Sequence, residues 1–205
     1  MKTLLCAALA AAVLTMAAPA QAGRNCEQTV PSVQSVERSL ALAERTARRL
    51  DQTGANVVVL ARNGQDLSRY GLRWSHLGLA YRDEQDGKPV WRVVHKLNHC
   101  GTSEAQLYRQ GLGEFFLDRP HRYEAAFVPL APALQSRLQA LLADNARAAA
   151  LHEPRYSMVA YPWSTRYQQS NQWALETLAL AAGGGEGRRD AQSWLRAQGW
   201  QPTTL

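Results

Sequence analysis

Two strand-like segments around a tight turn constrain the fold most strongly. Residues 74–81 and 90–96 are rich in aliphatic and aromatic side chains, and the turn pair Asp86-Gly87 lies between them, which predicts a β-hairpin. A two-residue loop pairs residues whose numbers sum to 173, whereas a four-residue loop gives 175 and a loop centred one residue earlier gives 171. In each of these registers His76 and His95 lie on one face, directly opposite or diagonal to each other. A loop of odd length would separate them.

The rest of the chain mixes helical and strand patterns. Residues 35–50 place apolar side chains three or four apart between charged ones, as in an amphipathic helix. Further strands are expected at 56–62, 124–130 and 156–161, and further helices at 103–111, 131–151, 165–182 and 191–198. No βαβ unit repeats, so we predict a single α+β domain in which an antiparallel sheet packs against helices.

The N-terminal segment has the pattern of a secretory signal peptide. Lys2 precedes an apolar run from Leu4 to Leu14, and Ala20-Gln21-Ala22 has the small-x-small pattern of a cleavage site. The run is shorter than the roughly 20 residues of a membrane-spanning helix, and no later segment is long and apolar enough to span. We therefore expect residues 1–22 to be removed and residues 23–205 to form one exported domain, in a bacterial periplasm, without an integral membrane segment.

Export limits what the cysteines can do. Signal cleavage would remove Cys6 and leave Cys26 and Cys100, and two cysteines in an oxidising compartment most simply form one disulfide. Closing a loop of about 75 residues would stabilise the fold by about 4 kcal/mol in the chain-entropy model. The alternative is a catalytic Cys100, because His95 and His99 lie near it in the sequence.

Charge pattern and histidine spacing argue against two classes of ligand. The formal net charge is +6, but the arginines are scattered and the 35–50 helix also carries glutamates, which favours a solvated face over a nucleic-acid site. A zinc site built from His76, His95 and His99 would lack both the HExxH and the paired-cysteine spacing. We expect no nucleic-acid partner, no metal and no other cofactor.

Three pieces of sequence together resemble a known superfamily. They are Trp74-Ser75-His76-Leu77-Gly78-Leu79 on a strand, His95 on the next strand, and Gln169-Ser170-Asn171-Gln172-Trp173 at the start of a late helix. Their order resembles that of the circularly permuted papain-like hydrolases, the NlpC-related group. From Cys26 onward the chain is also similar to an exported bacterial family of unknown function usually placed in that superfamily. Its specific stretches are residues 74–79, 98–102 and 164–168.

The resemblance implies a permuted papain-like fold and a set of roles. His76 would be the base, His95 its orienter, and Ser170 would stand where those enzymes have a cysteine nucleophile. A serine gains less from a helix N-terminus than a cysteine does, and it needs full general-base help. The implied activity is hydrolysis or transfer of an amide or acyl group on cell-envelope peptide or lipid.

Other readings of these residues stay open. Trp74, Trp163 and Asn171 are candidates for lining a substrate cleft, although aromatic side chains more commonly fill a core. His76 could be a core histidine bonded to backbone, and Ser170 a polar residue in the first turn of its helix. The alternative function is a non-catalytic protein on the same fold that binds an envelope ligand or partner, and a third is a purely structural envelope protein.

Overall fold

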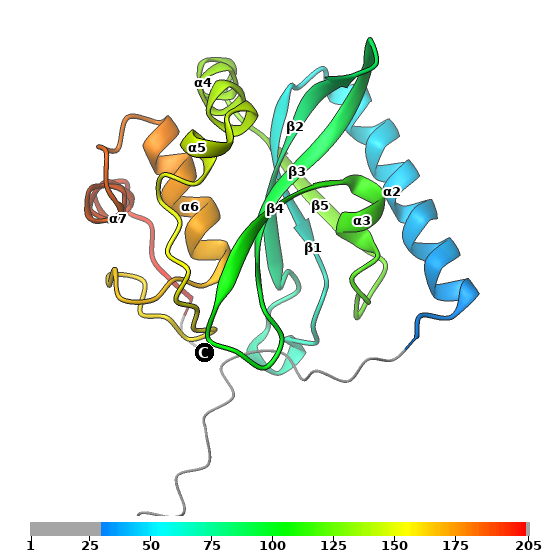
Figure 1. The fold of residues 1–205 in the computed structure, drawn as a ribbon, viewed down its shortest axis with the longest axis horizontal. Coiled ribbons are helices and arrows are strands. Elements are labelled where there is room, and N and C mark those ends of the chain that lie inside the picture. The colour runs from blue at the N-terminus through cyan, green and yellow to red at the C-terminus, as the bar shows by residue number, and fades with distance from the viewer. Residues whose placement is uncertain (1–29, 204–205) are drawn as a thin grey trace, which may run out of the picture.

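The computed structural model describes residues 30–203, and its centre is an antiparallel five-stranded open sheet. The strand order is β4-β3-β2-β1-β5, and Figure 1 shows helices on both sides of it. The strands are β1 (Val57–Arg62), β2 (His76–Gln85), β3 (Lys88–Asn98), β4 (Ala105–Gly111) and β5 (Ala125–Pro129). The helices are α2 (Val33–Thr53), α3 (Leu112–Phe116), α4 (Pro132–Ala143), α5 (Asn145–Ala148), α6 (Ser170–Ala181) and α7 (Arg188–Ala197), with a 3₁₀ turn η1 (Ser68–Tyr70). The predicted α+β class is confirmed.

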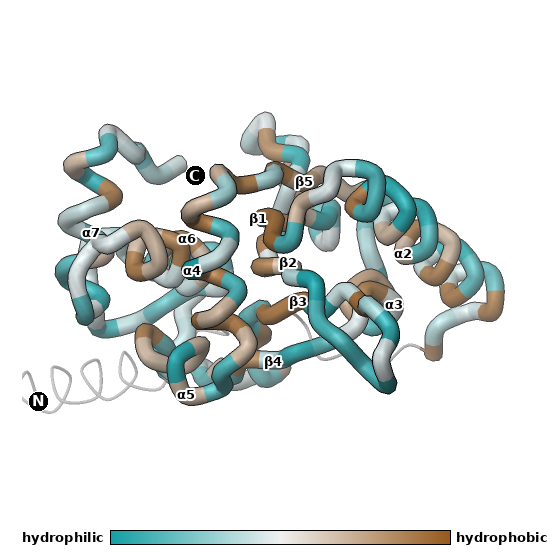
Figure 2. The backbone as a smooth tube through the Cα atoms, turned by 90° about the horizontal axis from the view of Figure 1, so that it is seen from above, coloured by the Kyte–Doolittle hydropathy of each residue, from teal (hydrophilic) through white to brown (hydrophobic). Residues whose placement is uncertain are grey.

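Each face of the sheet has its own hydrophobic core, because side chains alternate between the two faces along a strand. The face carrying Leu60 and Val93 packs against α2 and α3. The face carrying Leu79 and Val94 packs against α4 and α6. Helix α7 packs on the outer side of α6. Figure 2 shows the sheet as the middle layer, with α2 and α3 on one side and α4, α6 and α7 on the other.

Helix α2 confirms the amphipathic helix predicted at 35–50 and extends it at both ends. Its N-cap Ser32 accepts a hydrogen bond from the Ser35 N–H at 3.2 Å. Leu42 and Leu50 are buried against the sheet. Gly54 ends the helix in the left-handed conformation with φ of 67°.

The hairpin has the two-residue loop, which gives one of the three registers considered from the sequence. Asp86 and Gly87 have φ of 53° and 72°, and two successive positive values are typical of the type I′ turn that joins twisted antiparallel strands. Leu79 pairs with Val94, two residues whose numbers sum to 173. Because this register follows from the turn, the turn determines how the histidines of the two strands meet.

Three sequence predictions of secondary structure are wrong. Residues 103–111 were expected to be helical but contain β4, which adds to the outer edge of β3, so strand pairing overrides a weak local helix preference. Residues 156–161 contain turns in place of a strand. The helix expected over 131–151 is split at Asp144, whose carboxylate accepts hydrogen bonds from two backbone N–H groups and starts α5.

Two predictions concern segments outside the described residues. The signal peptide at 1–22 and Cys26 both lie there, so export and the Cys26–Cys100 disulfide stay predictions. Between residues 30 and 203, no helix is long and apolar enough to cross a membrane.

Candidate active site

The structure brings His76 and His95 into direct contact. His76 is the first residue of β2, and its Nε2 lies 2.9 Å from Nδ1 of His95 on β3. On the far side of His95, its Nε2 lies 2.7 Å from Oε1 of Gln110 on β4. Three neighbouring strands thus contribute one side chain each to a continuous hydrogen-bonded chain, which is the diagonal arrangement that the hairpin register predicts.

Phe115 of α3 covers this chain on the α2 side. Its ring centroid lies 5.1 Å from that of His95 and 5.9 Å from that of His76. Gly78 makes this close approach possible, since a Cβ there would lie 2.5 Å from Val93 Cγ1 and 3.2 Å from Phe115 Cε2. A side chain at position 78 would therefore push the aromatic ring away from the histidines.

Arg62, the last residue of β1, places a positive charge beside the histidines. Its guanidinium lies 4.6 Å from the Phe115 ring centroid, donates to the Phe115 carbonyl oxygen and pairs with Asp118. The Arg62 side chain is almost wholly buried. It therefore fixes α3 and the following loop against the end of the sheet, in addition to acting on His95 electrostatically.

Burial, followed by the charge of Arg62, lowers the pKa of His95 to about 4. His95 is 0% exposed and is therefore neutral near pH 7. The Gln110 oxygen accepts the proton of His95 Nε2–H, so His95 Nδ1 accepts from His76 Nε2–H. This arrangement places the lone pair of His76 on its Nδ1, and His76, at 9% exposure, is the more exposed member of the pair.

Ser170 belongs to the opposite face of the sheet. It is the first residue of α6, whose Trp173 and Ala174 pack into the core formed around Leu79. Its side chain is within hydrogen-bonding range of the Tyr156 hydroxyl. The histidines lie on the sheet face that packs against α3, whereas α6, which begins with Ser170, packs on the other face.

Asn171 has a positioning role at the start of β2. Its Oδ1 accepts a hydrogen bond from the Leu77 N–H at 2.8 Å, and its Nδ2 donates to the Ser75 carbonyl oxygen at 3.4 Å. These two backbone groups flank His76. Asn171 therefore holds the strand that carries His76 and does not contribute its amide to a cleft.

The two tryptophans proposed to line a cleft lie in different places. Trp163 packs edge-on against Trp200 at a centroid distance of 5.3 Å and lies under the guanidinium of Arg196, on the α7 side of the molecule. Trp74 lies two residues before His76 and is stacked by Arg73 at 5.0 Å. Of the two, only Trp74 belongs to the histidine end of the sheet.

The sequence interpretation missed Gln110, Arg62 and Phe115. Gln110 was hidden because its segment was expected to be helical; as part of a strand next to 90–96, its alternation would have placed it on the face of His95. Arg62 is the last residue of a predicted strand. Nothing in the sequence indicated that its charged side chain would be buried. Phe115 lies over the histidines because α3 packs against the sheet, and no local sequence pattern indicates that packing.

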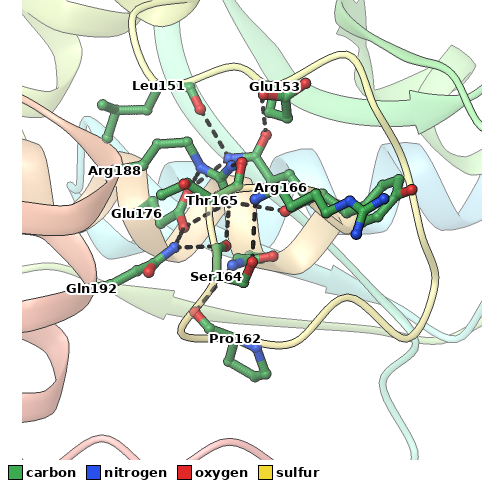
Figure 3. A network of polar contacts seen from close by, with 12 residues as sticks. Leu151, Glu153, Pro162, Ser164, Thr165, Arg166, Glu176, Arg188 and Gln192 are labelled. Carbon is green, nitrogen blue, oxygen red and sulfur yellow. Dashed lines mark hydrogen bonds and ion pairs between the residues drawn. The ribbon is translucent and has the colours of Figure 1, made fainter.

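A second buried polar cluster lies on the α6 face (Figure 3). Lys96 of β3 donates through Nζ to the Glu153 carbonyl oxygen and, at 2.8 Å, to Gln168 Oε1. Gln168 donates in turn to Glu176 at 2.6 Å, and Arg188 forms an ion pair with Glu176. Burial lowers the pKa of Lys96 to about 7.

The second cluster fixes a long connection. Arg188 also donates to the carbonyl oxygens of Ser164, Thr165 and Tyr167, and Lys96 is fully buried. Hydrogen bonds thus tie the segment between α5 and α6 to the sheet and to α7. Within the stretch 164–168, Gln168 contributes its side chain to this cluster and three other residues contribute backbone carbonyl oxygens.

One comparison with known proteins identifies a family. Residues 49–205 match the model of DUF2145, described as an uncharacterized protein conserved in bacteria. The chain belongs to this family. The matched DUF2145 region includes every strand of the sheet, both histidines and Gln110. No curated protein and no solved structure matches the chain.

Proposed function

We propose that the protein is an exported, papain-like hydrolase-type domain that cleaves or transfers an amide or acyl group of cell-envelope peptide or lipid. The observation that carries this proposal is the hydrogen-bonded chain from Gln110 through His95 to His76. A base on one strand and its orienter on the next is the arrangement that the resemblance to papain-like enzymes implies. The pairing thereby supports the superfamily placement as well as the chemistry.

In this proposal His76 acts as the general base. Its Nδ1 takes a proton from a nucleophilic O–H as the oxygen attacks the carbonyl carbon, and it returns that proton to the departing amine or alkoxide. His95 stays neutral, because its pKa is about 4, and holds the His76 ring through its Nδ1. The charge that develops on His76 is shared along the hydrogen bonds to His95 and Gln110.

Ser170 is not the nucleophile in this proposal, because its side chain belongs to the α6 face of the sheet. We infer that water, or a hydroxyl of an acceptor substrate, supplies the attacking oxygen. In the papain-like enzymes a residue at a helix start provides the nucleophile. In this proposal the histidine pair instead activates a water molecule or a substrate hydroxyl.

The test is turnover of peptidoglycan fragments and of amide and ester lipids by the wild type and three variants. His76→Gln should abolish turnover, whereas Ser170→Ala should retain it, and His99→Gln is the matched control, because His99 is exposed in the turn after β3. Wild-type turnover in His76→Gln would refute the role of His76. Labelling by a fluorophosphonate probe that depends on Ser170 would restore the serine mechanism.

A non-catalytic binding protein is the second candidate. It is favoured by the tight cover of Phe115 over the histidines and by the location of Ser170. On this reading the wild type and His76→Gln bind the same fragments with equal affinity in calorimetry, and neither shows turnover.

A further inference from the structure

The connection between α5 and α6 carries an exposed apolar loop. Met158, Val159 and Tyr161 are 43%, 79% and 66% exposed, and residues 156–163 contain no charged side chain. Isolated exposed apolar residues are ordinary, but three within four positions of one loop concentrate apolar surface there, and such surface is typical of a binding site. We call residues 156–163 the apolar loop.

Hydrogen bonds and ring packing anchor both ends of the apolar loop. The Ala160 N–H donates to the Ser157 carbonyl oxygen at 3.1 Å, closing a turn. Gln172 of α6 donates through Nε2 to the Pro162 carbonyl oxygen at 3.1 Å, and Trp163 is wedged against Trp200. The apolar side chains at the tip are thus exposed while both ends of the loop are anchored.

The charges around the apolar loop are complementary to an anionic surface. Arg155 and Arg166 flank the loop in sequence, and Arg196 stacks on Trp163 at its base. Arg155 and Glu153 form an ion pair at 2.8 and 3.0 Å and neutralise each other, so the net positive charge beside the loop comes from Arg166 and Arg196. Aliphatic tips, amphipathic tyrosine and tryptophan, and neighbouring arginines are the combination that favours the interface of a lipid bilayer.

The apolar loop lies at the same end of the sheet as His76. The Tyr156 N–H donates to the Ser103 carbonyl oxygen at 2.6 Å, just before β4 begins. In an antiparallel sheet the start of β4 and the start of β2 are at one end, and Figure 1 shows this yellow connection at the lower end of the molecule. A surface contacted by the loop would therefore face the histidine end of the sheet.

We propose that the apolar loop docks the protein on a membrane surface rich in anionic phospholipid, with Met158, Val159 and Tyr161 entering the interface. This proposal stands on the loop alone and does not depend on the catalytic assignment.

A tryptophan placed in the loop reports on insertion. Tyr161→Trp and Val128→Trp each add one fluorophore to the full chain; Val128 is the control because it is 62% exposed on β5, away from the loop. The vesicles contain phosphatidylethanolamine and phosphatidylglycerol with brominated acyl chains, which quench tryptophan only on contact. We expect quenching beyond the wild-type level, with a blue shift, for Tyr161→Trp and not for Val128→Trp. Phosphatidylcholine vesicles should give less quenching.

A second substitution makes the result specific to the loop. In the Tyr161→Trp background, Val159→Asp should remove the extra quenching, and Val128→Asp should leave it intact. Equal quenching in the two tryptophan variants would overturn the proposal. So would a blue shift of Tyr161→Trp that rises with protein concentration in the absence of vesicles, because the loop would then contact a second copy of the chain.

Discussion

Acidification should destabilise the folded protein through His95. Its pKa falls from 6.5 to about 4 on folding because the ring is buried next to Arg62. Between these two pH values the unfolded chain binds a proton that the folded chain does not, so the free energy of unfolding decreases as the pH falls through this window. A shift of this size corresponds to about 3 kcal/mol, at 1.36 kcal/mol for each pH unit.

The assay is urea unfolding of the wild type and His95→Gln at a series of pH values between 7 and 4. Glutamine has an oxygen to accept from His76 and an N–H to donate to Gln110, but it does not titrate. The stability of the wild type relative to the variant should therefore fall by about 3 kcal/mol across the window. NMR titration of the imidazole checks the same quantity directly.

Two results would refute this reasoning. One is an imidazole of His95 that titrates in the folded protein at or above its ordinary pKa. The other is an identical pH dependence of unfolding in the wild type and His95→Gln. Either would mean that burial does not lower the pKa of His95, so that the ring would gain a proton on its Nδ1 already below about pH 6.5 and His76 would lose its hydrogen-bond acceptor there.

The remaining predictions concern packing and buried charge. Gly78→Ala should destabilise the fold by about 1–3 kcal/mol, measured by urea unfolding, because the new methyl group would overpack the sheet under α3. Glu176→Ala should cost about 3–5 kcal/mol, since it leaves Arg188 buried without its carboxylate, whereas Glu44→Ala in an exposed pair should cost at most about 0.5 kcal/mol. Lys96 binds its proton more weakly in the folded state, so stability should rise with pH between about 7 and 10.5, and Lys96→Met should remove that rise.

The sequence was sufficient to predict the hairpin and to predict that its two histidines lie close together on one face. A turn that requires positive φ at Asp86-Gly87 admits few registers, and every loop of even length leaves His76 and His95 on one face. No comparable local rule exists for β4, which is a strand because β3 offers an edge to pair with. Because β4 was predicted to be a helix, the contact between Gln110 and His95 was not predicted either.

The position of Ser170 needed tertiary information. The helix predicted over 165–182 begins five residues later, at Ser170, where the side chain of Gln169 caps it. Which face of the sheet the helix covers depends on the stripe formed by Trp173 and Ala174 and on the partners available to it. Helices pack on both faces of the sheet, and the order of the motifs along the chain does not determine which face a given helix covers.

The hydrogen bond between Asn171 and the Leu77 N–H joins residues 94 positions apart. Closing so long a loop costs chain entropy before the contact contributes anything, and contacts of this kind form slowly. We therefore expect the strand boundary beside His76 to be completed late in folding. A growing chain interrupted before α6 would contain both imidazoles but would lack Asn171, which holds the strand start that carries His76, so the geometry of this pair depends on residues near the end of the chain.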